Sequence, residues 1–134
     1  MLEHLNRYWR VVATGFCFAM FGLGGLVIRL VVYPLLLLFT RDAERRKSAA
    51  QAVIHHSFRF FVGLMNFVGV ISYEVRHLER LDRKGLLILA NHPSLIDVVF
   101  LISLIPRADC IVKASLLRNP FTRGPIHAAG FICN

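Results

Sequence analysis

The residues best suited to chemistry lie in the segment Asn91-His92-Pro93-Ser94-Leu95-Ile96-Asp97. His92 directly follows an apolar run, and the carboxylate of Asp97 comes five residues later. A carboxylate that accepts the Nδ1 proton of His92 fixes the tautomer of the ring and raises its basicity, so that Nε2 can take a proton from a hydroxyl group. The segment therefore predicts His92 as a general base and Asp97 as the residue that orients it.

The same residues have a purely structural interpretation. Asn91 and His92 can lie in a loop that satisfies the free N–H groups of a helix, and Asp97 can be a first-turn carboxylate stabilised by the helix dipole. The chain has six histidines, so an aspartate five positions after one of them has about one chance in three of arising by accident. Spacing alone therefore gives the two interpretations equal weight.

The elements around this segment indicate an α/β sheet. Apolar and polar residues alternate over 73–77, whereas 86–90 is apolar throughout, as in a buried central strand. The expected order is a strand at 73–77, a strand at 86–90, a helix at 94–105, a strand at 110–112, a helical piece near Ser115 and a strand at Phe131. In such folds, ligands bind at the carboxyl ends of strands, where His92 lies. The chain stops inside its last apolar run, which suggests a truncated product with an incomplete sheet.

The N-terminal segment is compatible with lipid over most of its length. Residues 11–28 are 18 consecutive uncharged residues, and ten more follow Arg29, whereas a spanning helix needs about 20. Basic residues flank the stretch on both sides, which gives no clean orientation for a single crossing. The pattern favours a monotopic hairpin that enters one leaflet, bends and returns. The bend is expected among Gly22, Gly24, Gly25 and Pro34. The alternative is one tilted transmembrane helix in which Arg29 reaches the interface.

A second helix is expected over residues 48–71, where polar or small residues recur at spacings of three and four. They are Ser48, Gln51, His55, Arg59, Gly63 and Asn66. Most of the remaining circumference is apolar, which predicts an interfacial or packing helix. His55 and His56 cannot chelate a metal together, because neighbouring helical residues point about 100° apart.

Composition excludes several classes of protein. The 134 residues carry a net charge of +8, yet 56% are hydrophobic, 18% are charged and the mean hydropathy is +0.58. This balance argues against a disordered chain, and the long apolar runs favour anionic lipid headgroups over nucleic acid as the counter-charge. The three cysteines show no metal or CxxC spacing and suit a reducing compartment. A metal site from His77, His92, Cys110 and Cys133 lacks any recognised ligand spacing, so none is expected.

In the segment 91–97 and the residues that follow it, the sequence resembles the lysophospholipid acyltransferase family, which includes 1-acylglycerol-3-phosphate acyltransferases. Asn91, His92 and Asp97 match its first motif, Asn-His-x-x-x-x-Asp, with Ser94 as the customary serine. The resemblance covers residues 73–134. It continues through 111–113, Leu116, Asn119-Pro120 and Gly124 into the second motif region at 130–132. Two features depart from the family: Asn134 stands where the second motif ends in arginine, and the third motif, Phe-Pro-Glu-Gly-Thr-Arg, is absent.

The resemblance implies a reaction and its participants. His92 deprotonates an acceptor hydroxyl, which attacks the thioester of acyl-CoA or of an acyl-carrier protein with no covalent enzyme intermediate and no cofactor. Lys113 matches a basic residue used near the acceptor phosphate, and Arg118 and Arg123 are further candidates, although all three have a plain surface interpretation. The Asn ending looks like a bacterial subgroup whose acceptor need not be lysophosphatidate.

The expected protein is an α/β acyltransferase fragment on a membrane. Residues 1–72 form a membrane-associated helical hairpin, and residues 73–134 form an incomplete α/β acyltransferase sheet. Membrane lipid, a lysophospholipid-like acceptor and the acyl donor are its expected partners, at the cytoplasmic face of a membrane, with the bacterial inner membrane favoured. The competing hypothesis is a truncated, non-catalytic membrane protein that mediates packing or partner contacts.

Overall fold

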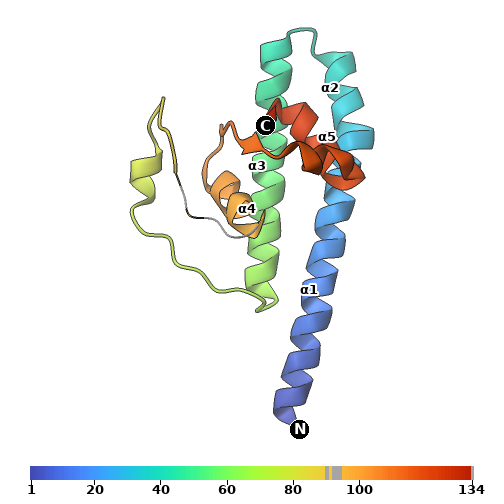
Figure 1. Cartoon of the computed structure of the whole chain (residues 1–134), viewed down its shortest axis with the longest axis vertical. Coiled ribbons are helices and arrows are strands. Elements are labelled where there is room, and N and C mark those ends of the chain that lie inside the picture. The colour runs from blue at the N-terminus through green and yellow to red at the C-terminus, as the bar shows by residue number, and fades with distance from the viewer. Residues whose placement is uncertain (90, 92–94, 134) are drawn as a thin grey trace.

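A computed structural model describes residues 1–89, 91 and 95–133 of the chain. Its first half is a helical hairpin (Figure 1). The first arm runs through α1 (Leu2–Val27), the π-helical turn η1 (Ile28–Val32) and α2 (Tyr33–Phe39). The second arm, α3 (Ala43–Phe67), returns alongside it. Asp42 begins α3 as its N-cap, because its carboxylate accepts a hydrogen bond from the N–H of Glu44 at 3.1 Å.

The bend predicted within the first apolar segment is wrong. Leu2–Phe39 is one continuous helix of 38 residues, and none of the three glycines nor Pro34 reverses it. Pro34 closely follows the wide π-helical turn η1, and such a local widening lets a helix continue past a residue that has no N–H. The chain reverses instead after Thr40, whose backbone is extended, so the two arms of the hairpin are α1–α2 and α3.

Two apolar clusters join the hairpin to the second half of the chain. One contains Cys17 of α1, Phe61 and Met65 of α3 and Val99 of the later helix α4 (Leu95–Leu104). The other contains Ile28, Ile54, Ile102 and Ala129. At the far end of the hairpin, the indole N–H of Trp9 donates to the carbonyl of Val68 at 3.3 Å. The hairpin is therefore packed against the rest of the protein along one side.

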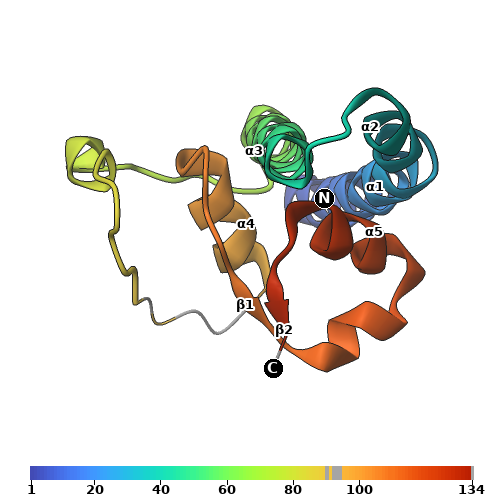
Figure 2. The same cartoon turned by 90° about the horizontal axis from the view of Figure 1, so that it is seen from above.

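The second half contains short elements on that side of the hairpin (Figure 2). They are the 3-10 turn η2 (Leu78–Leu81), α4, β1 (Ile111–Val112), the 3-10 turn η3 (Ala114–Arg118), α5 (Pro120–Ala129) and β2 (Ile132–Cys133). β1 and β2 are parallel, with Ile111 opposite Ile132 and Val112 opposite Cys133. The predicted helix at 94–105, strand at 110–112, helical piece near Ser115 and strand near Phe131 are confirmed. The mostly helical structure with its small sheet is compatible with the expected α/β class.

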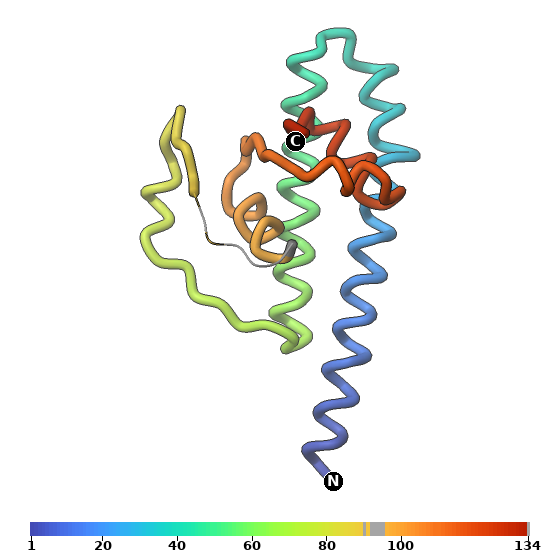
Figure 3. The backbone as a smooth tube through the Cα atoms, viewed as in Figure 1, coloured from blue at the N-terminus to red at the C-terminus, as the bar shows by residue number. Residues whose placement is uncertain are grey.

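The strands predicted at 73–77 and 86–90 are wrong for the residues that the structure describes. Residues 72–89, here called the arm, run beyond α4 without pairing to a strand (Figure 3). Leu87 and Leu89 are 81% and 87% exposed rather than buried. A central strand needs a hydrogen-bonded neighbour on each side, and the described strands β1 and β2 pair with each other. Tyr73 attaches the start of the arm to α4 by an edge-on ring contact with Phe100, with centroids 5.0 Å apart.

Candidate active site

Of the two residues predicted to carry the catalytic step, Asp97 lies in the first turn of α4. Its side chain is half-buried, and a carboxylate in a first helical turn is stabilised by the helix dipole. His92 lies outside the described residues. The pairing of the two side chains therefore stays a prediction from the motif.

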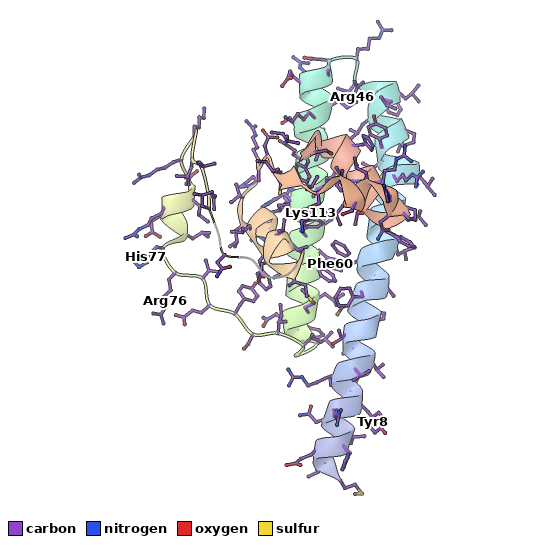
Figure 4. All side chains as sticks on the ribbon, in the orientation of Figure 1. Tyr8, Arg46, Phe60, Arg76, His77 and Lys113 are labelled. Atoms are coloured by element: carbon purple, nitrogen blue, oxygen red, sulfur yellow. The ribbon has the colours of Figure 1, made fainter. Side chains whose placement is uncertain are left out.

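Lys113 directly follows β1 and has an exposed side chain. Its backbone is extended and its carbonyl accepts a hydrogen bond from the N–H of Leu116 at 3.0 Å, which starts η3. Lys113 thus stands at the carboxyl end of a parallel strand, where α/β folds bind ligands. In Figure 4 it lies well apart from Arg76 and His77, which belong to the arm.

Arg123 lies in α5 and Arg118 at the end of η3, and both side chains are exposed. The start of α5 lies between them. Its N-cap is Asn119, whose side-chain oxygen accepts a hydrogen bond from the N–H of Phe121 at 3.0 Å. The guanidinium of Arg29 donates to the carbonyl of Pro120 at 3.4 Å, which ties the start of α5 to the hairpin. Arg118 and Arg123 therefore flank a well-anchored helix start.

A cavity of about 540 Å³ lies where the hairpin meets the second half of the chain. Its wall includes Val98, Val112 and Thr122, each of which is the chain neighbour of a candidate site residue: Asp97, Lys113 or Arg123. Residues of α1, α3, η3 and α5 complete the wall, among them Phe21, Phe61, Leu116 and Ile126. The cavity therefore connects the elements that carry the described candidate residues.

The wall of the cavity is mostly apolar, and its polar side chains are those of His56, Ser57, Cys110 and Thr122. Thr122 adds a hydroxyl, but this group donates to the carbonyl of Leu116 at 2.6 Å. Cys110 adds a thiol, and burial raises its pKa, which keeps it neutral. The volume of the cavity is within the range of about 300–1,000 Å³ that is common for ligand sites. A cavity of this size and chemistry fits a hydrocarbon chain.

Metal-binding groups are not clustered in the part of the chain that the structure describes. No three His, Cys, Asp or Glu residues there lie close enough to hold an ion. Cys17, Cys110 and Cys133 are free thiols.

Two features of the site were not predicted from the sequence. α5 was missed, although Asn119-Pro120 at its start and Gly130 at its end are recognisable helix caps. The contacts of Gln51 and His55 with the second half were also missed, although the polar stripe that contains them was recognised. A stripe of polar residues shows that one face of a helix is different, but it does not show what that face touches.

Comparison with known proteins identifies the class of the second half. Residues 72–133 match the model of the acyltransferase family. The matched segment is just under half of the chain; the match confirms the resemblance noted in the sequence and supports an acyltransferase activity in general. No curated protein and no solved structure matches the chain.

Proposed function

We propose that this protein is a membrane-associated O-acyltransferase that moves an acyl group from acyl-CoA or acyl-carrier protein to the hydroxyl of a lysophospholipid-like acceptor. The observation that carries the proposal is the apolar cavity, because its wall belongs partly to the acyltransferase segment and partly to the hairpin. A substrate in this cavity touches both parts at once. An acyl chain suits it, since each methylene group that leaves water contributes about 0.8 kcal/mol.

In the proposed reaction, Nε2 of His92 takes the proton of the acceptor hydroxyl while Asp97 holds the imidazole in the required tautomer. The acceptor oxygen bonds to the thioester carbonyl carbon, and the carbon–sulfur bond breaks. The thiolate of the donor leaves and receives the proton from the imidazolium. All atoms and charges balance without a cofactor.

Lys113 and Arg123 are proposed to bind the phosphate of the acceptor. Both side chains are exposed and both are chain neighbours of residues in the cavity wall. A cation at the mouth of an apolar cavity suits an amphiphile whose chain enters the cavity and whose anionic head stays outside.

The long apolar helix weakly indicates that the protein is associated with a membrane. Only 22% of its most apolar window is buried inside the protein, so it differs from the core helix of a soluble domain. At 1.5 Å per residue, its 38 residues span about 57 Å, whereas the hydrocarbon core of a bilayer is about 30 Å thick. We propose that the helix lies in the plane of one leaflet, at the cytoplasmic face and in the inner membrane if the source is bacterial.

An exposed apolar stripe supports this in-plane placement, because it follows the whole helix rather than a central section. It comprises Leu5, Trp9, Val12, Phe16, Leu23, Val27, Leu30 and Leu38, all exposed. Their spacings of three, four, seven and eight residues place them on one side of a helix. Arg7 and Arg10, at other positions of the first turns, stay free to face headgroups.

A test of the acceptor site compares lysophosphatidate with monoacylglycerol, which lacks the phosphate. Lys113→Gln should raise the KM for lysophosphatidate about 10-fold and leave the KM for monoacylglycerol unchanged, since one charge-assisted contact is worth about 1.5 kcal/mol. The control is Lys84→Gln, which removes an exposed lysine of the arm and should change neither value. Equal effects of Lys113→Gln on both acceptors would contradict the proposed phosphate contact, and absence of transfer to either acceptor by the unaltered protein would contradict the function.

A further inference from the structure

Three side chains of α3 form a row on one face of that helix: Lys47, Gln51 and His55. They are spaced four residues apart, which places them one above the next. All three make polar contacts with the acyltransferase segment. We call this row the α3 ladder.

Gln51 is the centre of the ladder and touches the chain just before each strand. Its amide nitrogen lies 3.0 Å from the Oδ1 atom of Asp109 and 3.5 Å from the carbonyl oxygen of Ala108. The same nitrogen lies 3.4 Å from the carbonyl oxygen of Ala129. Asp109 precedes β1 by two residues, and Ala129 precedes β2 by three. One amide group therefore holds the starts of both strands at the same level, which a parallel pair requires.

Lys47 strengthens the same junction. Its Nζ atom lies 3.0 Å from the Oδ1 atom of Asp109, which also accepts from Gln51. The methylene groups of Lys47 pass beside Gly130. Gly130 ends α5 with φ of 65° and turns the chain into β2, a conformation that favours glycine. Lys47 thus contacts both the turn before β1 and the residue that directs β2.

His55 extends the ladder to α4. It is 6% exposed, and its Nδ1 atom lies 2.8 Å from the carbonyl oxygen of Ile102. Because a carbonyl can only accept, Nδ1 carries the hydrogen and donates it. Ile102 is on α4, whose first turn contains Asp97. The ladder therefore contacts α4 and the starts of both strands.

We infer that Lys47, Gln51 and His55 are positioning residues for acyl transfer. The two strands have two residues each, and so short a pair is not stable alone. The ladder attaches the start of the β1–β2 pair and the end of α4 to one helix. It thereby fixes the position of Asp97 relative to Lys113. This inference rests on the proposed function and adds to it a role for the membrane hairpin: α3 is part of the frame of the active site as well as of the anchor.

The test uses Gln51→Met, which keeps the length of the side chain and removes its hydrogen bonds. We expect kcat to fall at least about 10-fold while the KM values for donor and acceptor stay within about twofold, because a misplacement of about 1 Å can cost 100-fold in rate. The matched control is Arg59→Met, two turns further along α3 at an exposed position, which should keep kcat. Melting followed by circular dichroism shows whether each variant is folded.

An exchange of the charges at positions 47 and 109 tests the same inference in a chain that keeps an ion pair between α3 and the turn before β1. Lys47→Glu and Asp109→Lys should each lower kcat, and the double variant should recover it to within about threefold of the unaltered protein, because opposite charges again face each other. The exchange restores the ion pair, while the amide nitrogen of Gln51 keeps the carbonyl oxygens of Ala108 and Ala129 as acceptors.

A folded Gln51→Met protein with unaltered kcat would overturn the positioning role, as would a charge exchange that fails to restore the rate of either single variant. If the unaltered protein transfers no acyl group, the proposed function itself fails and the positioning role falls with it. Loss of kcat in Gln51→Met, its retention in Arg59→Met and recovery in the double variant would establish the ladder.

Discussion

At the residue scale, the contact of α5 with α1 and η1 depends on two glycines. A methyl group at Gly25 would overlap the carbonyl oxygen of Phe121, and one at Gly124 would overlap the side chain and backbone of Arg29. Pro125 lies inside α5 and has no N–H, so the carbonyl of Phe121 receives no helical hydrogen bond from it. Each helix thus presents a glycine where the other approaches most closely.

This close approach predicts that Gly124→Ala destabilises the protein by about 1–3 kcal/mol, the usual cost of overpacking. The loss is expected despite the better helix propensity of alanine. Gly63→Ala is the matched control, because Gly63 is also helical but has no atom within 4 Å of the added group, and it should stabilise α3 by about 0.5–1 kcal/mol. Denaturant unfolding in detergent measures both. Equal effects of the two substitutions would contradict the described packing.

Cys110 provides a pH-dependent test of the cavity wall. Burial raises the pKa of its thiol, and only the thiolate reacts with iodoacetamide. In a Cys17→Ala, Cys133→Ser background, we therefore expect the alkylation rate of Cys110 to reach half its maximum above about pH 8.5, the ordinary value for cysteine. In denaturant the midpoint should return to that value. A folded-state midpoint at or below 8.5 would show that this thiol is not buried.

Sequence alone predicted some residues of the site and not others. His92, Asp97 and Lys113 belong to a contiguous motif and to a strand end, so their residue types and spacing pointed to them. Thr122 and Leu116 line the cavity only because α5 and η3 fold back against the hairpin. Their side chains carry no chemical signal in the sequence, and tertiary packing alone brings them to the site.

At the element scale, the sequence patterns succeeded where local interactions decide the structure. α4 and η3 have local hydrogen bonds and lie close to their predicted positions, whereas α3 covers Ala43–Phe67 and is shifted toward the N-terminus from the predicted 48–71. The strands at 73–77 and 86–90 failed because a strand depends on a partner far along the chain. The bend near Pro34 failed because the wide turn η1 carries the helix past the proline without a break.

The element η3 gives a direct test of the cavity as an acyl site. Leu116 lines the cavity, whereas its neighbour Leu117 does not, and both are half-buried. Leu116→Trp should shift the preference toward donors shorter by about two methylene groups, with about a 10-fold loss of kcat/KM for the longer chain, because each methylene contributes about 0.8 kcal/mol. Leu117→Trp should leave the chain-length preference unchanged. A profile over acyl donors of increasing length measures this, and identical profiles for both variants would contradict an acyl chain in the cavity.

At the scale of the whole molecule, the hairpin and the acyltransferase segment share their core. The two apolar clusters and the cavity contain residues from both halves, and the α3 ladder of the first half contacts Asp109 and Ile102 of the second. An in-plane helix would then hold the cavity at the membrane surface, where an acceptor embedded in one leaflet and a donor from the aqueous phase can both reach it.

The in-plane placement predicts the sidedness of the two ends of the long helix. In a chain freed of its natural cysteines, His4→Cys and Arg41→Cys place a thiol at exposed positions on either end. An impermeant maleimide should label both from the cytoplasmic side in inverted vesicles, and neither in sealed vesicles of the opposite orientation. Labelling of the two positions from opposite sides would show a transmembrane helix instead.

His92 is proposed to be the general base of an acyl transfer at this site. The most direct measurement compares the acyl-transfer kcat of the unaltered protein, His92→Ala and His127→Ala, with acyl-CoA and acyl-carrier protein as donors and a lysophospholipid as acceptor. His127 is an exposed histidine of α5 and serves as the matched control. We expect His92→Ala to lose at least about 100-fold in kcat, the usual contribution of a general base, and His127→Ala to keep the rate. A His92→Ala protein that transfers acyl groups at the unaltered rate would contradict this proposal.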